Sequence, residues 1–300
     1  MLSAIAPKLY TTAAAAAPPA RIAMGLRMVR TRAVWLLMRL VPHERMSRWA
    51  GRGLLRPLTP LTGRGELSIL GGTAVRLRIE AQSFAPWGAQ AYAVLTGTHE
   101  IQVQQALIRS LRPGDHVWDV GANIGYLALV AARIVGPAGR VVAIEPDPDC
   151  AAAIRANAAL NGLETVEVLE AAASERSGVA ELVVVRDRLW TRLASVGDHH
   201  DGERRVEVRT VALDDVDAPP PALVKIDVEG AEVDVVAGMT RLLRDARPIV
   251  ICEMHGRNAE FCAAIQDAGY TVTNLDGPEP VAEADVNVHA LCTPPLAGVP

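Results

Sequence analysis

Short apolar runs alternate with helix-like segments along most of this chain, and this alternation constrains the fold more than any other feature. The apolar runs bounded by turn formers are expected to be strands, at 116–120, 140–146, 166–172, 222–230 and 248–255. Apolar residues at helical spacing follow at 124–135, 148–160, 232–245 and 257–268. Strands separated by helices at this interval predict an α/β fold with a mostly parallel, doubly wound sheet. The carboxyl ends of such strands share one edge, where ligands bind.

Weaker patterns surround this repeat. We expect a hairpin over 65–79, a loop over 81–97 and a helix over 99–111. Two further runs, 180–185 and 204–213, flank a polar insertion over 186–203, where Trp190 is a candidate for stacking on a sugar or for a surface loop. Short strands are expected near 270–275 and 286–291.

A glycine turn joins the strand at 116–120 to its helix. Gly121 and Gly125 bound the turn, and Asn123 stands where a dinucleotide-binding loop has its second glycine. Turn amides and the positive end of the helix dipole would face a ligand above the strand. The spacing therefore argues against a pyrophosphate, although a purely structural turn remains an alternative.

Acidic residues follow several of the expected strands. Glu145 lies at the spacing from Asp119 at which a carboxylate binds both ribose hydroxyls in dinucleotide-type folds. Glu145 indicates a nucleoside, but the turn lacks a pyrophosphate-binding loop. Because Asp119 places a negative charge beside the turn, we expect a ligand with a cationic part. S-adenosylmethionine has an ammonium, a sulfonium and one carboxylate, so it fits these residues better than a nicotinamide dinucleotide does. A solvated strand-end charge is the alternative for Glu145.

The sequence resembles the FkbM family of S-adenosylmethionine-dependent methyltransferases over roughly residues 95–256. The resemblance is carried by VWDVGANIGYLAL from 117, GRVVAIEPDP from 139 and VKIDVEGAE from 224. It implies a Rossmann-like class I methyltransferase fold, in which a seven-stranded sheet ends in an antiparallel hairpin. It also implies O-methylation of a hydroxyl on a sugar, a glycolipid or a polyketide-type metabolite, with nitrogen acceptors also known.

The residues expected to surround the cofactor lie mainly at strand ends. They are Glu100, Asp119, Gly121, Asn123, Gly125, Tyr126, Glu145, Pro146, Ala172, Ser174 and Asp227.

A hydroxyl acceptor must lose a proton, so a base near the methyl group is useful. His255 is the first candidate because of its ordinary pKa, with Asp227 and Glu229 as competitors. His255 as a structural residue, and Glu229 and Glu232 as caps of the next helix, are the alternatives. Asp227, Glu229, Glu253 and His255 could ligate Mg²⁺, but strand-end acids imitate such sites easily, so no metal is predicted.

The first 64 residues differ from the rest. They contain eleven Lys and Arg and one Glu, whereas the whole chain has a formal net charge of −4. We expect residues 1–64 to be a basic, partly helical or disordered extension and residues 65–300 to form the methyltransferase domain. No stretch of the extension is apolar enough to span a membrane, and export is not expected. The four cysteines lack metal-site or CxxC spacing, so we expect them to be small buried residues. Free cysteines are typical of a reducing compartment, which favours a cytoplasmic location.

Two rival functions follow from these observations. A nicotinamide-dependent oxidoreductase would need the glycine that Asn123 replaces. A non-catalytic protein could use the basic extension to contact an anionic membrane weakly. Nucleic acid is not an expected partner, since no RNA-binding motif is present. The expected partner is a hydroxylated small molecule or glycan, and the sequence does not indicate an oligomeric state.

Overall fold

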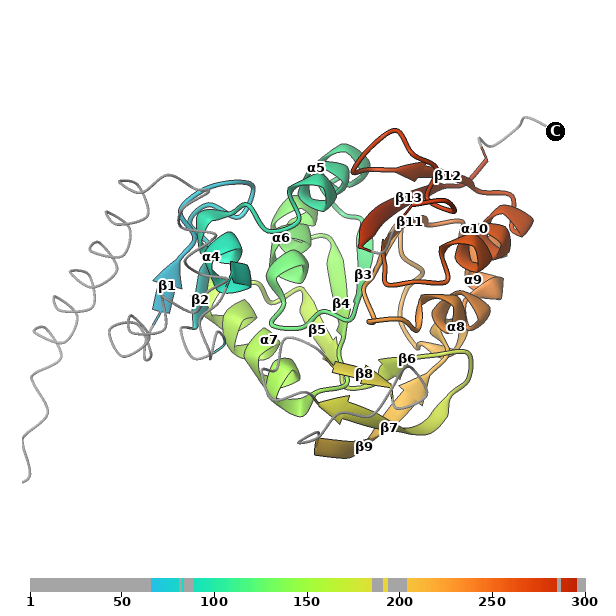
Figure 1. Ribbon diagram of the computed structural model, residues 1–300. Coiled ribbons are helices and arrows are strands. Elements are labelled where there is room, and N and C mark those ends of the chain that lie inside the picture. The colour runs from blue at the N-terminus through green and yellow to red at the C-terminus, as the bar shows by residue number, and fades with distance from the viewer. Residues whose placement is uncertain are drawn as a thin grey trace, which may run out of the picture.

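The computed structural model describes residues 66–80, 83, 89–184, 191–193, 204–284 and 287–295. Seven strands form the central sheet in the order β12-β13-β11-β10-β3-β4-β5 (Figure 1). They are β3 (His116–Val120), β4 (Arg140–Ile144), β5 (Val166–Leu169), β10 (Leu223–Ile226), β11 (Ile249–Met254), β12 (Thr271–Asn274) and β13 (Val288–Thr293). All neighbouring pairs are parallel except those that β13 makes with β11 and β12. The predicted parallel sheet with an antiparallel C-terminal hairpin is confirmed.

Helices cover both faces of this sheet. On one face lie α4 (Ala89–Thr96), α5 (Ile101–Ser110), α6 (Tyr126–Val135) and α7 (Pro148–Asn161). On the other lie α8 (Glu232–Ala237), α9 (Thr240–Asp245) and α10 (Asn258–Asp267). Successive strand residues point to opposite faces, so Val117 belongs to the first core cluster and Trp118 to the second. The central strands β3, β4 and β10 are therefore buried on both sides, as the sequence indicated.

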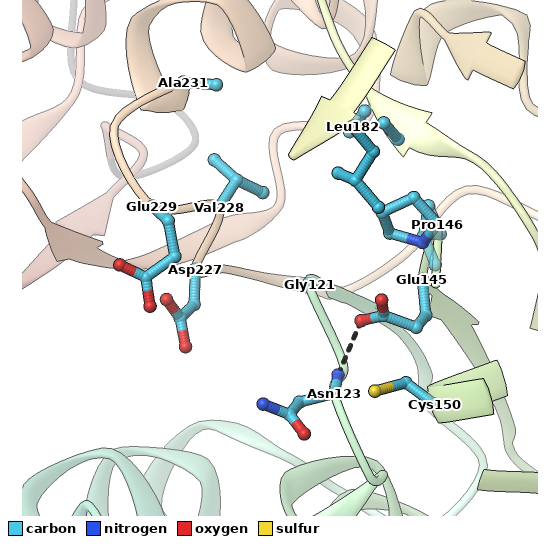
Figure 2. Close-up of a pocket in the computed structure, with 13 residues that line it drawn as sticks. Gly121, Asn123, Glu145, Pro146, Cys150, Leu182, Asp227, Val228, Glu229 and Ala231 are labelled. Atoms are coloured by element: carbon cyan, nitrogen blue, oxygen red, sulfur yellow. Dashed lines mark hydrogen bonds between the residues drawn. The ribbon is translucent and has the colours of Figure 1, made fainter. Parts of the chain in front are cut away.

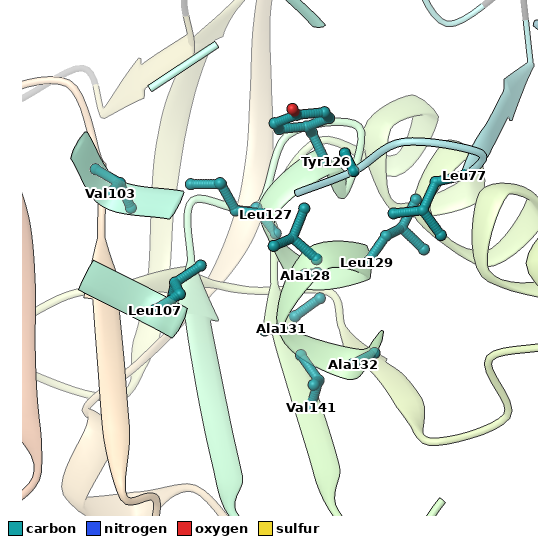
Figure 3. Packing of buried hydrophobic residues seen from close by; sticks show 14 of the residues in the cluster. Leu77, Val103, Leu107, Tyr126, Leu127, Ala128, Leu129, Ala131, Ala132 and Val141 are labelled. Carbon is teal, nitrogen blue, oxygen red and sulfur yellow. The ribbon is translucent and has the colours of Figure 1, made fainter. Parts of the chain in front are cut away.

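Small residues bring α6 close to the sheet. Ala128, Ala131 and Ala132 are fully or almost fully buried, and Figure 3 shows them packed beside Val141 of β4. Val103 and Leu107 of α5 contribute to the same cluster. This packing fixes the first turn of α6 directly after the glycine turn, which positions the turn above the carboxyl end of β3.

Two helical expectations were wrong. The segment expected as a loop over 81–97 contains α4, whose Tyr92, Val94 and Leu95 are buried. Tertiary burial stabilises this short helix, which has weak amphipathic periodicity. The single helix expected over 232–245 is divided into α8 and α9 at Gly238. A Cβ on Gly238 would lie 2.1 Å from the carbonyl oxygen of Ser174, so this close backbone contact admits only glycine.

A smaller sheet, also unpredicted as a separate unit, lies beside the central one (Figure 1). Its order is β6-β9-β7-β8, with β6 (Ala172–Ala173), β7 (Gly178–Val184), β8 (Thr191–Leu193) and β9 (Arg204–Val211). The run expected as one strand over 166–172 is divided between the two sheets, because β5 pairs with β4 whereas β6 pairs with β9. The chain after β5 therefore leaves the central sheet and forms the second sheet beside it.

The predicted hairpin near the N-terminus is confirmed in shorter form. Strands β1 (Glu66–Ser68) and β2 (Arg78–Glu80) pair antiparallel, with Leu67 opposite Ile79. Residues 1–64, including the expected basic extension, lie outside the described residues, as does most of the insertion over 186–203 with Trp190. Among the described helices, none is long and apolar enough to cross a membrane. All four cysteines are free and buried, as predicted.

Candidate functional site

The glycine turn is held between the ends of two neighbouring strands. The amide of Gly121 donates to the carbonyl oxygen of Ile144 at the end of β4. A Cβ on Gly121, whose φ is 75°, would lie 1.7 Å from the carbonyl oxygen of Asp227, beyond β10. Asn123 also has a positive φ, of 51°. This backbone geometry explains why glycine is needed at 121.

Two adjoining cavities lie on either side of this turn. The first encloses about 600 Å³ and the second about 480 Å³, counting space that is open to solvent. Gly121, Asn123 and Asp227 line both. Figure 2 shows Glu145 and Pro146 on one side of the first cavity and Asp227 and Glu229 on the other. The cavities lie at the carboxyl ends of β3, β4 and β10, the edge that the sequence indicated.

Glu145 is the polar centre of the first cavity. Its Oε2 accepts a hydrogen bond from the amide of Asn123 at 2.8 Å, and its Oε1 accepts one from the amide of Asp147 at 2.9 Å. The side chain is almost completely buried, and this burial raises its pKa to about 8 even though the two amides act in the opposite direction. The amides fix the carboxylate in place, and lone pairs remain for two ligand hydroxyls.

Apolar side chains line the first cavity beside Glu145. Pro146 and Ala172 were predicted to lie here. Ala173 and Leu182, from the smaller sheet, and Cys150 at the start of α7 also line it, and of these Leu182 and Cys150 were not predicted. An apolar surface beside a fixed carboxylate suits a purine base attached to a ribose.

Asp119 dominates the second cavity, which Glu100 and Tyr126 also line, as predicted. Neither carboxylate oxygen of Asp119 has a hydrogen-bond partner of normal geometry among the described residues. Burial raises the pKa of Asp119 to about 6, although the nearby Lys225 ammonium opposes that shift. A buried carboxylate with two free oxygens is costly unless a ligand donates to it. An ammonium group is the natural ligand.

Lys225 is a residue of this site that sequence reasoning missed. Its Nζ lies 3.1 Å from Asp227 Oδ2 and 4.0 Å from Asp119 Oδ1. Burial alone would lower the pKa of Lys225, but Asp227, Glu100 and Asp119 raise it above its usual range. The ammonium therefore balances part of the negative charge around the turn. The available signal was a lysine inside an otherwise apolar strand, which requires a buried acidic partner.

His255 lies beside the first cavity but is not among the residues that line either one. Its Nδ1 is 2.9 Å from Glu232 Oε1, and its Nε2 is 3.5 Å from Glu229 Oε2. Burial would lower the pKa of His255, but the hydrogen bond to Glu232 and the carboxylates around it raise that pKa to about 9. The ordinary pKa that favoured His255 as a base is therefore not found in this environment.

The acids next to His255 have different roles. Glu232 accepts a hydrogen bond from the amide of Gly230 at 2.8 Å, so it holds the turn before α8, but no side chain caps that helix and the expected cap is not found. Glu229 lines the first cavity, and burial raises its pKa to about 7, while His255 opposes that shift.

Two predicted cofactor residues lie outside both linings. Gly125 directly precedes α6 and packs against Ile154, where a Cβ would lie 3.1 Å from a side-chain carbon. Ser174 follows β6 and donates its amide to the carbonyl oxygen of Val211. The other predicted cofactor residues line at least one cavity.

The hydrogen-bond acceptors in the two cavities fit S-adenosylmethionine. Glu145 offers acceptors to a diol, and Asp119 offers two unpartnered acceptors to an ammonium. The turn between them is shared by both cavities, as a ligand that joins a nucleoside to an amino acid requires.

Comparison with known proteins agrees with this geometry. The model of the methyltransferase FkbM domain family matches residues 119–274. The hexuronic acid methyltransferase AglP of Haloferax volcanii is 30% identical over 52% of this chain and 62% of its own length, which is under two thirds. The 31-O-demethyl-FK506 methyltransferase FkbM of Streptomyces tacrolimicus is 30% identical over 63% of this chain and 84% of its own length.

Among solved structures, an FkbM methyltransferase from Methylobacillus flagellatus KT is 17% identical, with a TM-score of 0.42 over 68% of this chain and 54% of that one. The family match covers more than half of the chain, including the glycine turn, Glu145 and β10 through β12. This protein is a member of the FkbM methyltransferase domain family and has a Rossmann-like class I methyltransferase fold.

Proposed function

We propose that this protein transfers the methyl group of S-adenosylmethionine to a hydroxyl group of a small molecule or glycan. The observation that carries this proposal is the pair of cavities that share one turn, with Glu145 in the first and the unpartnered Asp119 in the second. These positions match the chemistry of a ribose diol and an ammonium group. The methyltransferase family of the chain supports the same reading over a nicotinamide-dependent oxidoreductase.

In this proposal the predicted cofactor residues divide into two groups. Glu145 binds the ribose hydroxyls, and Pro146 and Ala172 contact the base. Asp119, Glu100 and Tyr126 surround the amino-acid part, and the amides of the turn from Gly121 to Asn123 face its carboxylate. Lys225 orients Asp119 and Asp227 through its buried ammonium. Gly125 and Ser174 support the shape of the site from behind.

The bound sulfonium supplies a methyl group that is already activated for in-line displacement, so positioning accounts for much of the catalysis. We assign the removal of the acceptor's proton to Glu229, because it lines the first cavity and its neighbour Asp227 is held by Lys225. His255 lies behind Glu229, with 3.5 Å between Nε2 and Oε2, and acts as a positioning residue. Asp227 remains the competing base on geometry.

The acceptor class rests on the names of the relatives. One relative is named for hexuronic acid and the other for the 31-O position of FK506, so each name indicates an oxygen-rich acceptor. A hydroxyl on a sugar, glycolipid or polyketide-type metabolite is the acceptor that we propose here. A weak membrane contact of residues 1–64 stays a prediction, because those residues lie outside the described part of the chain.

The test is a methyl-transfer screen with S-adenosylmethionine labelled on the methyl group. The purified full chain is incubated with hydroxylated sugars, glycolipids and macrolides, and products are located by mass spectrometry. We expect transfer to an oxygen, and we expect Glu145→Ala to abolish it. In Glu229→Gln, kcat should fall at least about tenfold while cofactor affinity stays unchanged. Transfer to nitrogen alone, or full activity in Glu145→Ala, would refute the proposal.

A further inference from the structure

A second cluster of polar groups lies at the edge of the cofactor cavities, where α5 meets the antiparallel end of the sheet. Glu253 of β11 and His289 of β13 are direct register partners, so their side chains share one face of the sheet. Glu100 precedes α5 with a φ of 45° and lines the second cavity. Elements far apart in sequence therefore place these three side chains together.

The inner atoms of the cluster make no direct hydrogen bonds with one another. His289 Nε2 lies 3.7 Å from Glu253 Oε2 and 4.0 Å from Glu100 Oε2, which is too far for hydrogen bonds. Within the described residues, Nε2 of His289 and Oε2 of Glu100 are buried and have no hydrogen-bond partner. His289 as a whole is 9% exposed. Unpartnered buried polar atoms that converge on one point are costly unless something is bound between them.

The outer atoms of the same side chains are held in place. Asp276 Oδ2 lies 2.9 Å from Nδ1 of His289, which favours the tautomer with a lone pair on Nε2. Nε2 of His99 lies 2.9 Å from Oε1 of Glu100, so only Oε2 of that carboxylate remains free. A histidine oriented by a carboxylate is the usual arrangement behind a metal-ligating imidazole.

We propose that Glu100, Glu253 and His289 bind a divalent transition-metal ion, with Asp276 as the residue that orients His289. Their donor atoms all lie within 4.8 Å of one another. Metal bonds of roughly 2.0–2.2 Å would bring such donors to about 3.0–3.4 Å, so contraction by less than about 2 Å completes the site. One imidazole with two carboxylates suits Zn²⁺ or Mn²⁺ better than Mg²⁺, which prefers oxygen ligands.

A general base and a buried ion pair are both less consistent with the geometry of this cluster than a metal site is. If His289 were a general base, an acceptor hydroxyl would have to reach Nε2, which is buried. If His289 were a cation paired with the two carboxylates, Nε2 would be expected to approach at least one oxygen within hydrogen-bond distance. The neighbouring group of Asp227, Glu229 and His255 has similar spacing, but none of its atoms is among the buried unpartnered ones. The proposed site shares Glu253 with the set considered in the sequence, but its other ligands, Glu100 and His289, were not part of that set.

The site does not depend on the proposed methyl transfer, and metal binding can be measured without it. The untagged full chain is dialysed against a chelator and titrated calorimetrically with Zn²⁺, Mn²⁺ and Mg²⁺. We expect one Zn²⁺ or Mn²⁺ per chain, bound at least about tenfold more tightly than Mg²⁺. Co²⁺ should give visible absorption bands from a site with nitrogen and oxygen ligands.

Variants distinguish this site from adventitious binding. His289→Gln and Glu100→Gln should weaken Zn²⁺ binding at least about 100-fold, and Asp276→Asn about 10-fold to 100-fold, as expected for a residue that orients a ligand. His116→Gln, at the opposite end of β3, is the matched control and should bind as the parent does. Circular dichroism would verify that each variant is folded. Absence of stoichiometric binding, or loss in His255→Gln with retention in His289→Gln, would overturn the proposal.

Discussion

Asp119 and Glu145 are both buried carboxylates, but they differ in their hydrogen bonds. The oxygens of Glu145 are fixed by two backbone amides, whereas those of Asp119 line the second cavity without a hydrogen bond of normal geometry among the described residues. Lys225 balances part of the charge of Asp119, but a buried carboxylate without good hydrogen bonds still destabilises a fold, which points to a ligand that supplies the missing donors. The two residues should therefore respond differently to substitution and to pH.

For Asp119→Asn we expect a loss of affinity that depends on the amino-acid part of the ligand. S-adenosylhomocysteine, which has an ammonium, should bind about 10-fold to 100-fold more weakly, because a charged hydrogen bond is lost. 5′-Methylthioadenosine lacks that ammonium and should bind nearly as it does to the parent. Calorimetric titration of both ligands measures the difference, and an equal loss for the two would show that Asp119 does not face the ammonium.

The pKa of Glu145, raised to about 8 by burial, predicts a pH-dependent affinity for the nucleoside. Two ribose hydroxyls that donate to the carboxylate favour its ionised form and lower its pKa in the complex. Binding should therefore be strongest above pH 8 and weaken as the pH falls through 8, by at most about tenfold per pH unit.

5′-Methylthioadenosine is the suitable probe for this effect, because it has no amine that titrates in the same range. Titrations in buffers of different ionisation enthalpy should show release of up to one proton near pH 7, and Glu145→Gln should abolish it. Proton uptake, or an unchanged release in the variant, would contradict this assignment.

At the scale of elements, the turn after β3 determines where the site can form. The turn at Gly121 packs against the carbonyl oxygen of Asp227, which follows β10. A side chain at residue 121 would separate the ends of β3 and β10. The apolar strands and the glycine spacing predicted this region well, because both are local signals in the sequence. The division of 166–172 between two sheets and the helix α4 depend on tertiary contacts, which local patterns do not reveal.

Replacement of Gly121 by alanine tests the turn. The new Cβ would meet a backbone oxygen, so we expect a loss of more than about 2 kcal/mol in the free energy of unfolding. Gly114→Ala is the matched control, because Gly114 also has a positive φ, of 92°, but a Cβ there meets nothing within 4 Å. Only the backbone penalty of about 1 kcal/mol should remain in the control. Urea unfolding measures both, and equal effects would exclude a steric role for the contact with Asp227.

At the scale of the whole molecule, the site is assembled from segments that are distant in sequence. The central sheet contributes Asp119, Glu145 and Asp227 at its edge, and the smaller sheet contributes Leu182. Strand-end acids could be found from the sequence, because parallel strands align their carboxyl ends. The partners of Lys225 and the role of His289 could not, since they arise from register with neighbouring strands and from the position of α5.

The central claim is that the edge of the sheet binds an adenosyl amino acid with Glu145 at the ribose. Its most direct test is calorimetric titration of the full-length protein with S-adenosylhomocysteine, in parallel with Glu145→Gln. The account predicts one ligand per chain. The affinity should be at least about tenfold lower in the variant, because glutamine replaces the charged carboxylate that accepts hydrogen bonds from the diol. Absence of binding in the parent protein, or equal affinity in the two proteins, would contradict it.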